Sequence, residues 1–85
     1  MKSFEYVIQD ELGLHARPAG LLVKEAKQFA SKINLTKDGK TVSATQLMML
    51  MSMGAKRGAT ITVTVEGEDE DVACAAIEKF FRENL

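Results

Sequence analysis

The segment Thr60–Glu66, with the sequence TITVTVE, constrains the fold more than any other part of the chain. Apolar Ile61, Val63 and Val65 alternate with polar residues, so a strand here has one apolar and one polar face. A strand with one solvent-exposed face is typical of an antiparallel sheet that is covered on one side. We therefore expect a sheet with one face open to solvent.

Local patterns predict the other elements, which are strands at Phe4–Ile8, Lys32–Thr36 and Thr41–Ser43 and helices at Ala16–Gln28, before Gly54 and at Asp69–Asn84. An Asp38-Gly39 turn of the hairpin type joins the second and third strands. Ser43 and Gln46 have the spacing of a capping box, which would open the second helix. The order βαββαβα predicts an α+β open-faced β-sandwich, built as a single domain over residues 1–85.

The last predicted helix has a buried stripe formed by Ala73, Ile77 and Phe80. The acidic run Glu66–Asp71 comes just before and within its first turn. Its spacing does not match a calcium-binding loop, and we expect these charges to favour the positive end of the helix dipole.

The only histidine lies in the segment Gly13–Ala19, with the sequence GLHARPA, where a helix is predicted to begin. Pro18 suits a first helical turn because it has a fixed φ and no N–H to leave unpaired. Gly13 permits the backbone conformation that a tight approach to the helix demands. Unpaired N–H groups and the positive dipole end make such a helix start an anion site. His15, Arg17 and the helix start together predict a phosphate site that contains a nucleophile.

Phosphoryl transfer is the chemistry that these groups favour. An imidazole that is neutral at cellular pH can attack phosphorus and form a covalent phosphoramidate. The backbone N–H groups of Ala16 and Arg17 and the Arg17 guanidinium would then bind the phosphoryl group. The alternative is that His15 is an ordinary loop residue or a polar cap of the helix.

Composition restricts the remaining classes of function. Hydrophobic residues make up 46% and charged residues 27% of the chain, which are globular values. A net charge of −1 argues against nucleic acid as a partner. With one cysteine, Cys74, and no signal peptide or membrane-length apolar run, we expect a cytoplasmic monomer without membrane insertion. Cys74 is expected to be a small core residue rather than a redox sensor, and we expect no metal or cofactor.

Two features predict a docking surface around His15. The segment Leu47–Met53 is apolar on nearly all sides. Either it is well buried, or some methionines face solvent while Leu47, Leu50 and one of Met51 and Met53 face the core. One face of the first helix carries Arg17, Gly20, Lys24 and Lys27. These basic side chains would attract acidic partners, although such a face can also be simply solvated.

Over its whole length the chain resembles the HPr family, the histidine-containing phosphocarriers of the bacterial phosphoenolpyruvate-dependent sugar phosphotransferase system. The resemblance rests on Gly13–Ala19, Asp38-Gly39-Lys40, the helix Leu47–Gly54 and Glu66–Glu70. It implies a four-stranded antiparallel sheet with three helices on one face. It also implies that His15 accepts a phosphoryl group through Nδ1 from phosphorylated enzyme I and passes it to enzyme IIA domains. Such a carrier is phosphorylated stoichiometrically and is not itself an enzyme.

The resemblance further implies roles for individual residues. Arg17 and the amides of Ala16 and Arg17 would hold the phosphoryl group. The partner surface would comprise Gly20, Lys24, Lys27, Leu47, Met48 and Met51. Gln46 stands where many members have a regulatory serine, and glutamine cannot be phosphorylated.

Several alternatives stay open at this point. Thr45 or Ser43 would be either a displaced regulatory site or, more in keeping with their position, caps of the second helix. The chain could be a regulatory relative that transfers no phosphoryl group, although such a relative has another residue at the position of His15. A nitrogen-branch phosphocarrier and a small phosphohydrolase that uses Arg17 are the remaining readings.

Overall fold

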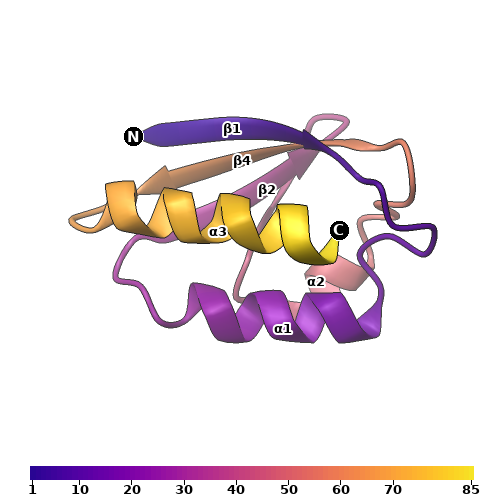
Figure 1. Cartoon of the computed structure of the whole chain (residues 1–85), viewed down its shortest axis with the longest axis horizontal. Helices are drawn as coiled ribbons and strands as arrows, with labels where there is room; N and C mark the ends of the chain where they lie inside the picture. The colour runs from indigo at the N-terminus through magenta and orange to yellow at the C-terminus, as the bar shows by residue number, and fades with distance from the viewer.

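The computed structural model describes all residues from 1 to 85. Its strands are β1 (Lys2–Val7), β2 (Lys32–Lys37), β3 (Lys40–Ser43) and β4 (Thr60–Glu66), and its helices are α1 (Ala16–Ala26), α2 (Leu47–Met51) and α3 (Glu70–Asn84). The four strands form one antiparallel sheet in the order β1-β4-β2-β3. Figure 1 shows all three helices on one face of this sheet. The predicted βαββαβα open-faced sandwich is therefore confirmed, and none of its helices is both long and apolar enough to span a bilayer.

Strand β4 forms the centre of the core, as its alternation predicts. Ile61, Val63 and Val65 are completely buried beneath the helices. Val63 lies opposite Phe4 of β1 and Leu35 of β2, so one apolar row crosses the sheet. Burial of such a row is the main source of stability in a domain of this size.

Helix α3 covers the sheet with the predicted residues and with one more. Ala73, Ile77 and Phe80 are buried. Phe81 is also completely buried, and its ring meets those of Phe4 and Tyr6 edge to face at centroid distances of 5.8 and 5.5 Å. These four buried residues pack α3 against the sheet, including β1, the strand that leads into the His15 loop.

The predicted capping box of the second helix is wrong. Ser43 is the last residue of β3, where it pairs with Asn34 of β2. Its hydroxyl accepts the Thr45 N–H at 3.2 Å, and α2 begins only at Leu47, without a side-chain cap from Gln46. The role of Ser43 and Thr45 as helix caps is therefore also wrong, because strand pairing holds Ser43 in the sheet.

Other element boundaries differ by a few residues. Strand β1 is Lys2–Val7 rather than 4–8, because its ladder with β4 runs from Lys2 opposite Val65 to Val7 opposite Thr60. Helix α1 ends at Ala26 instead of Gln28, where the Gln28 N–H bonds to the nearer Glu25 carbonyl and tightens the last turn. Sequence patterns predict the ends of helices and strands poorly, because terminal turns fray and bury few side chains.

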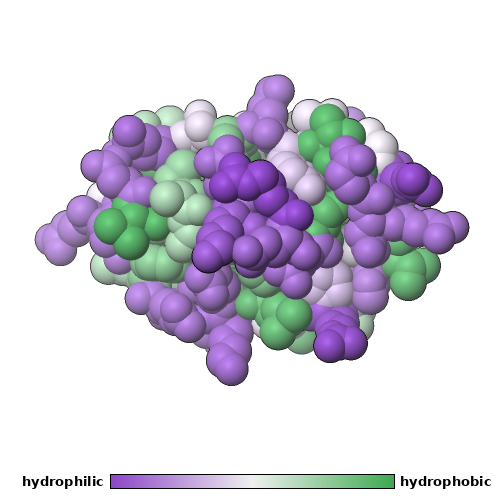
Figure 2. All heavy atoms as spheres, viewed as in Figure 1, coloured by the Kyte–Doolittle hydropathy of each residue, from purple (hydrophilic) through white to green (hydrophobic).

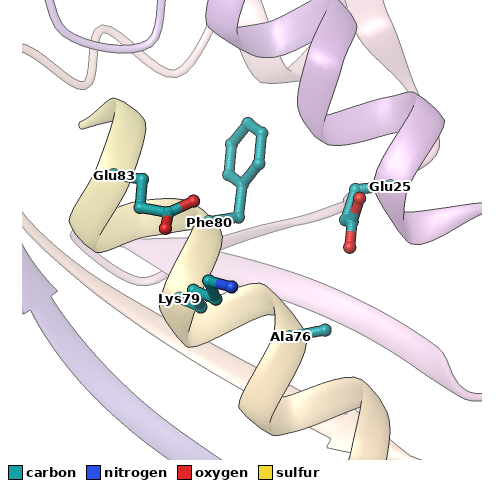
Figure 3. A pocket seen from close by; sticks show the side chains of 5 residues that line it. All are labelled: Glu25, Ala76, Lys79, Phe80 and Glu83. Carbon is teal, nitrogen blue, oxygen red and sulfur yellow. The ribbon is translucent and has the colours of Figure 1, made fainter.

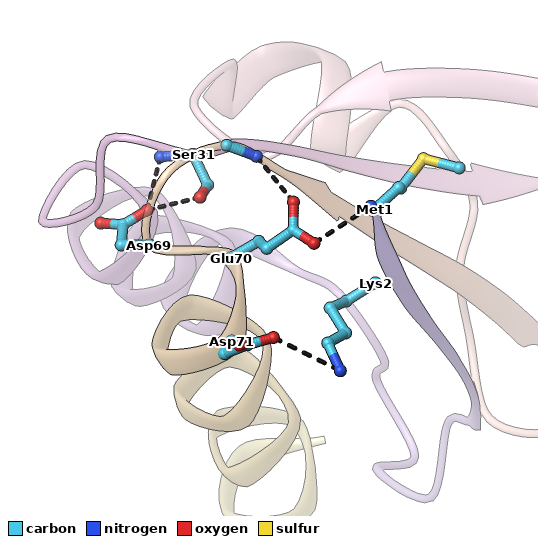
Figure 4. A network of polar contacts seen from close by, with 7 residues as sticks. Met1, Lys2, Ser31, Asp69, Glu70 and Asp71 are labelled. Carbon is cyan, nitrogen blue, oxygen red and sulfur yellow. Dashed lines mark hydrogen bonds and ion pairs between the residues drawn. The ribbon is translucent and has the colours of Figure 1, made fainter.

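Asp69, the acidic residue directly before α3, ties the loop that precedes this helix to the loop between α1 and β2 (Figure 4). Asp69 accepts the amides of Ala30 and Ser31 at 2.8 and 2.9 Å, and it also accepts the Ser31 hydroxyl. These hydrogen bonds, with that of the Ser31 hydroxyl the strongest and that of the Ala30 amide next, lower the pKa of Asp69. Glu70 and Asp71 lie in the first turn of α3 as expected. Asp69 does not cap the helix; it fixes the loop between α1 and β2.

The lowered pKa of Asp69 makes stability depend on pH. Because the folded state favours the carboxylate, its contribution is present above the pKa of the unfolded chain and is lost as acid protonates it. We expect Asp69→Asn to lower the free energy of unfolding at pH 7 and to flatten its decline between pH 6 and pH 3. Urea unfolding at both ends of that range measures this. Glu68→Gln is the matched control, because Glu68 is exposed and makes no hydrogen bond or ion pair. An unchanged pH dependence in Asp69→Asn would contradict the assignment.

Candidate functional site

The loop before α1 is held against the loop that follows α2. The Leu14 N–H donates to the Ala55 carbonyl at 2.8 Å, and Leu14 is buried. Gly13 has φ +67°, and a Cβ on it would lie 2.0 Å from the same carbonyl oxygen. Only glycine fits this approach, which confirms the conformational need for Gly13 and sets where His15 leaves the loop.

His15 is the residue that immediately precedes helix α1. Its backbone is extended and its carbonyl accepts the Ala19 N–H at 2.9 Å, which is the first bond of the helix. The N–H groups of Ala16 and Arg17 make no hydrogen bond within the chain. The next residue, Pro18, has no N–H, so these two amides are the free donors at the helix start. The His15 side chain is 41% exposed and makes no cap, so the cap alternative is wrong.

Two shallow hollows meet at the imidazole. The first, of about 260 Å³, is lined by Asp10, His15, Arg17, Pro18, Leu21 and Asn84. The second, of about 200 Å³, is lined by Leu12, Leu14, His15, Met51, Gly54, Ala55 and Lys56. The Arg17 side chain is exposed and forms no ion pair within the chain, so its charge is available to an anion in the first hollow.

The predicted partner residues lie on two helices that pack against each other, α1 and α2. Lys24 and Lys27 are exposed and Gly20 is half-buried. The side of α2 that faces solvent carries Leu47, Met48, Met49 and Met51, with Met48 75% exposed. The possibility that this helix is well buried is therefore wrong, and so is a core position for Leu47. Leu50 lies in the core as expected, and Met53 rather than Met51 joins it. A five-residue helix has room for only one buried row.

Sequence patterns missed six residues of this region, which are Asp10, Leu12, Leu21, Ala55, Lys56 and Asn84. Asp10 and Leu12 are in a loop without periodicity, and Asn84 comes from the far end of the chain. The Leu85 carbonyl accepts the Gln9 and Asp10 amides at 2.5 and 2.9 Å, which brings the end of α3 to this loop. Only the exposed Leu21, on the polar side of an amphipathic helix, offered a signal in the sequence.

The face formed by α1 and α3 differs from the His15 region. Figure 2 shows hydrophilic residues over its middle, with hydrophobic residues in separate groups. Its hollow of about 270 Å³ lies between α1 and α3 and is lined by Glu25, Ala76, Lys79, Phe80 and Glu83 (Figure 3). None of the predicted site residues lines it, and its acidic and basic groups are mixed.

Cys74 lies on α3, half-buried, and packs against the core as expected. Burial, with the nearby Glu78 carboxylate as the second cause, raises the pKa of the Cys74 thiol. A raised pKa keeps the thiol protonated and poorly reactive at neutral pH, which favours the core role over redox sensing.

An open-faced sandwich with an exposed histidine before free helix amides defines a class of small phosphoryl carriers. The family described as "PTS HPr component phosphorylation site" matches residues 2–83. This chain therefore belongs to the HPr family, whose members carry a phosphoryl group and are not catalysts in their own right. The recognition made from the sequence is confirmed.

Solved structures agree with this assignment. HPr-C-His from Thermoanaerobacter tengcongensis is 38% identical with a TM-score of 0.92, and the match covers 98% of this chain and 93% of that one. Phosphocarrier protein HPr from Bacillus anthracis is 39% identical with a TM-score of 0.87, covering 94% of this chain and 95% of that one. Crh, the Bacillus subtilis catabolite repression protein, is 38% identical with a TM-score of 0.78, covering 100% and 98%. HPr proteins and Crh thus match this chain at nearly equal identity, while the TM-score of Crh is lower.

Proposed function

We propose that this protein accepts a phosphoryl group on Nδ1 of His15 from phosphorylated enzyme I and passes it to enzyme IIA domains during sugar uptake. It does so as a single-domain cytoplasmic monomer, without cofactor or metal. The observation that carries the proposal is the exposed His15 imidazole directly before the two unbonded amides of Ala16 and Arg17. Family membership supports the same partners.

Moderate binding of the phosphoryl group is what a carrier requires. Two amides and one guanidinium stabilise the group enough to survive diffusion, and the exposed site lets it leave. The partner supplies further transition-state stabilisation when donor and acceptor nitrogens are aligned with the phosphorus. The exposed methionines of α2 and the lysines of α1 form the docking surface, since flexible thioethers adapt to unlike partners and basic charges speed encounter with acidic ones.

Intact-mass measurement after incubation with phosphoenolpyruvate and enzyme I tests the proposal. We expect a gain of one phosphoryl group that is lost in mild acid, as a phosphoramidate is, and lost again on addition of an enzyme IIA domain. No gain with the cognate enzyme I, which must be active on another acceptor, would overturn the proposal.

A regulatory role like that of Crh is the second candidate, because Crh matches as closely in identity as the carriers do. The presence of His15 argues against a purely regulatory role, since this residue supplies a nucleophile at the helix start. Gln46, which precedes α2, also has no hydroxyl for a serine kinase. Phosphorylation by enzyme I without transfer to any enzyme IIA would favour this candidate. Phosphorylation only by a nitrogen-branch enzyme I would assign the chain to that branch instead.

The Arg17 guanidinium is expected to accelerate transfer by stabilising charge on the phosphoryl group. Hydrogen bonds to charged groups contribute about 1.5–3 kcal/mol, so we expect Arg17→Ala to slow phosphoryl acceptance by roughly tenfold or more. Rapid-quench measurement of single turnover gives this rate. Lys40→Ala, which removes one exposed positive charge from the β2–β3 hairpin, is the control. Equal rates in the two variants would mean that Arg17 acts only through net charge.

A further inference from the structure

We infer that Asp10 is a positioning residue for His15. Its carboxylate holds the Nε2 edge of the imidazole ring toward itself and so leaves Nδ1 free as the nucleophile. This inference rests on the proposed phosphorylation of His15. Its basis is the 3.9 Å separation between Oδ2 of Asp10 and Nε2 of His15, with both side chains about two-fifths exposed. Both residues also line the first hollow.

The Asp10 carboxylate is held in place independently of the histidine. Its Oδ2 accepts the amides of Leu12 and Gly13, each at 3.0 Å. Its own N–H donates to the Leu85 carbonyl at 2.9 Å, which anchors the loop to the buried end of α3. The carboxylate therefore does not have to be ordered when the ring becomes charged, which limits the entropic cost of the interaction.

Anchoring the loop does not require the negative charge. A neutral amide oxygen could accept the same two N–H groups. The charge becomes useful only beside a positive partner, and the nearest ring nitrogen is Nε2 of His15. The other charged groups lining the two hollows, Arg17 on α1 and Lys56 after α2, are both positive, so Asp10 supplies the negative one.

The transfer step shows where this charge acts. The lone pair on Nδ1 forms the N–P bond, the bond from phosphorus to the donor nitrogen breaks, and its electron pair returns to the donor. The Nε2 proton stays on His15, so the ring becomes a cation as the bond forms. Asp10 pairs with that cation on the side of the ring away from the phosphoryl group. A separation of 3.9 Å in the free protein is consistent with a contact that shortens as charge develops.

Asp10→Asn tests the inference because it keeps an oxygen for the Leu12 and Gly13 amides and removes the charge. Glu11→Gln is the matched control, since Glu11 is exposed in the same loop and makes no hydrogen bond or ion pair. With saturating phosphorylated enzyme I, we expect the single-turnover rate of Asp10→Asn to fall about threefold, as for an exposed ion pair. The enzyme I concentration that gives half the maximal rate is expected to stay unchanged, and Glu11→Gln is expected to match the wild type.

A spectroscopic measurement separates positioning from a merely structural role. In ¹⁵N spectra of the unphosphorylated protein with a neutral ring, we expect the Nε2–H tautomer of His15 to predominate and to lose population in Asp10→Asn. This readout on the wild type stands even where the variant does not fold.

Four outcomes would overturn the inference. They are equal rates in both variants, a change confined to the half-saturating concentration, a tautomer ratio that does not respond to Asp10→Asn, and a wild type in which the Nδ1–H tautomer predominates. Failure of the wild type to accept any phosphoryl group would refute the proposed function instead, while the tautomer measurement would still test the contact.

Discussion

Replacing His15 by alanine abolishes phosphorylation by enzyme I while leaving the fold intact. This is the expected result because the chain has one histidine and the reaction needs its lone pair. The His15 side chain makes no hydrogen bond, and its one ion pair, with Asp10, spans 3.9 Å between partly exposed groups. Substitutions of exposed residues away from special features usually change the free energy of unfolding by less than about 0.5 kcal/mol.

Intact mass after incubation with phosphoenolpyruvate and enzyme I measures the first effect, and thermal unfolding by circular dichroism measures the second. An unfolded His15→Ala protein would contradict the expected neutrality of the substitution for folding, and it would mean that the ring also has a structural role. A variant that still gains an acid-stable phosphoryl group would place the acceptor on a hydroxyl, with Ser43 and Thr45 the first residues to examine because both flank the start of α2. Phosphorylation that persists without His15 would contradict the proposed carrier mechanism.

Gly13→Ala is expected to destabilise the protein more than any other single-methyl change at a glycine of the His15 region. An alanine at φ +67° costs about 1–2 kcal/mol relative to glycine. The added Cβ would also lie 2.0 Å from the Ala55 oxygen and 2.6 Å from the Cα of Lys56, so backbone has to move. Overpacking of this kind typically costs a further 1–3 kcal/mol, roughly, and the movement breaks the Leu14–Ala55 hydrogen bond that positions His15.

Gly54→Ala is the matched control for this effect. Gly54 has nearly the same φ, +69°, but a Cβ there meets no atom within 4 Å. Both variants carry the conformational cost, and only Gly13→Ala carries the clash. Urea unfolding is expected to show a loss of about 3 kcal/mol or more for Gly13→Ala and about 1–2 kcal/mol for Gly54→Ala. Equal losses of unfolding free energy in the two variants would mean that the loop moves to accommodate the added methyl group at little cost. The close approach of Gly13 to Ala55 would then not be needed for stability.

The sheet and its covered face could be predicted because their signals are local. Alternation in β4 is a period-2 pattern over seven residues, and burial of Ile61, Val63 and Val65 follows from it directly. The start of α1 could be predicted equally well, because Pro18 and the spacing of the apolar residues after it indicate the beginning of a helix. The first amides of that helix are free. The His15, Ala16 and Arg17 constellation is contiguous in the chain, so its geometry needs only one helix turn.

The beginning of α2 could not be predicted in the same way. Ser43 has the spacing of a cap, yet its pairing with Asn34 across the β2–β3 hairpin keeps it in the sheet. Leu47 is an apolar residue on the solvent side, because only Leu50 and Met53 of this segment reach the core. Which apolar residues of a short helix are buried depends on how the helix sits on its neighbours, and a nearly uniform apolar run contains no information about that.

The sequence by itself determined the fold class and the family and indicated His15 as the proposed nucleophile, since each depends on local patterns and motifs whose residues are close together along the chain. The tertiary structure alone decided what surrounds His15. Asp10 and Asn84 are separated by most of the chain, and they line one hollow because α3 ends against the β1–α1 loop. The side chain that faces Nε2 of His15 is set by this long-range packing, because loop residues have no periodicity from which their neighbours can be derived.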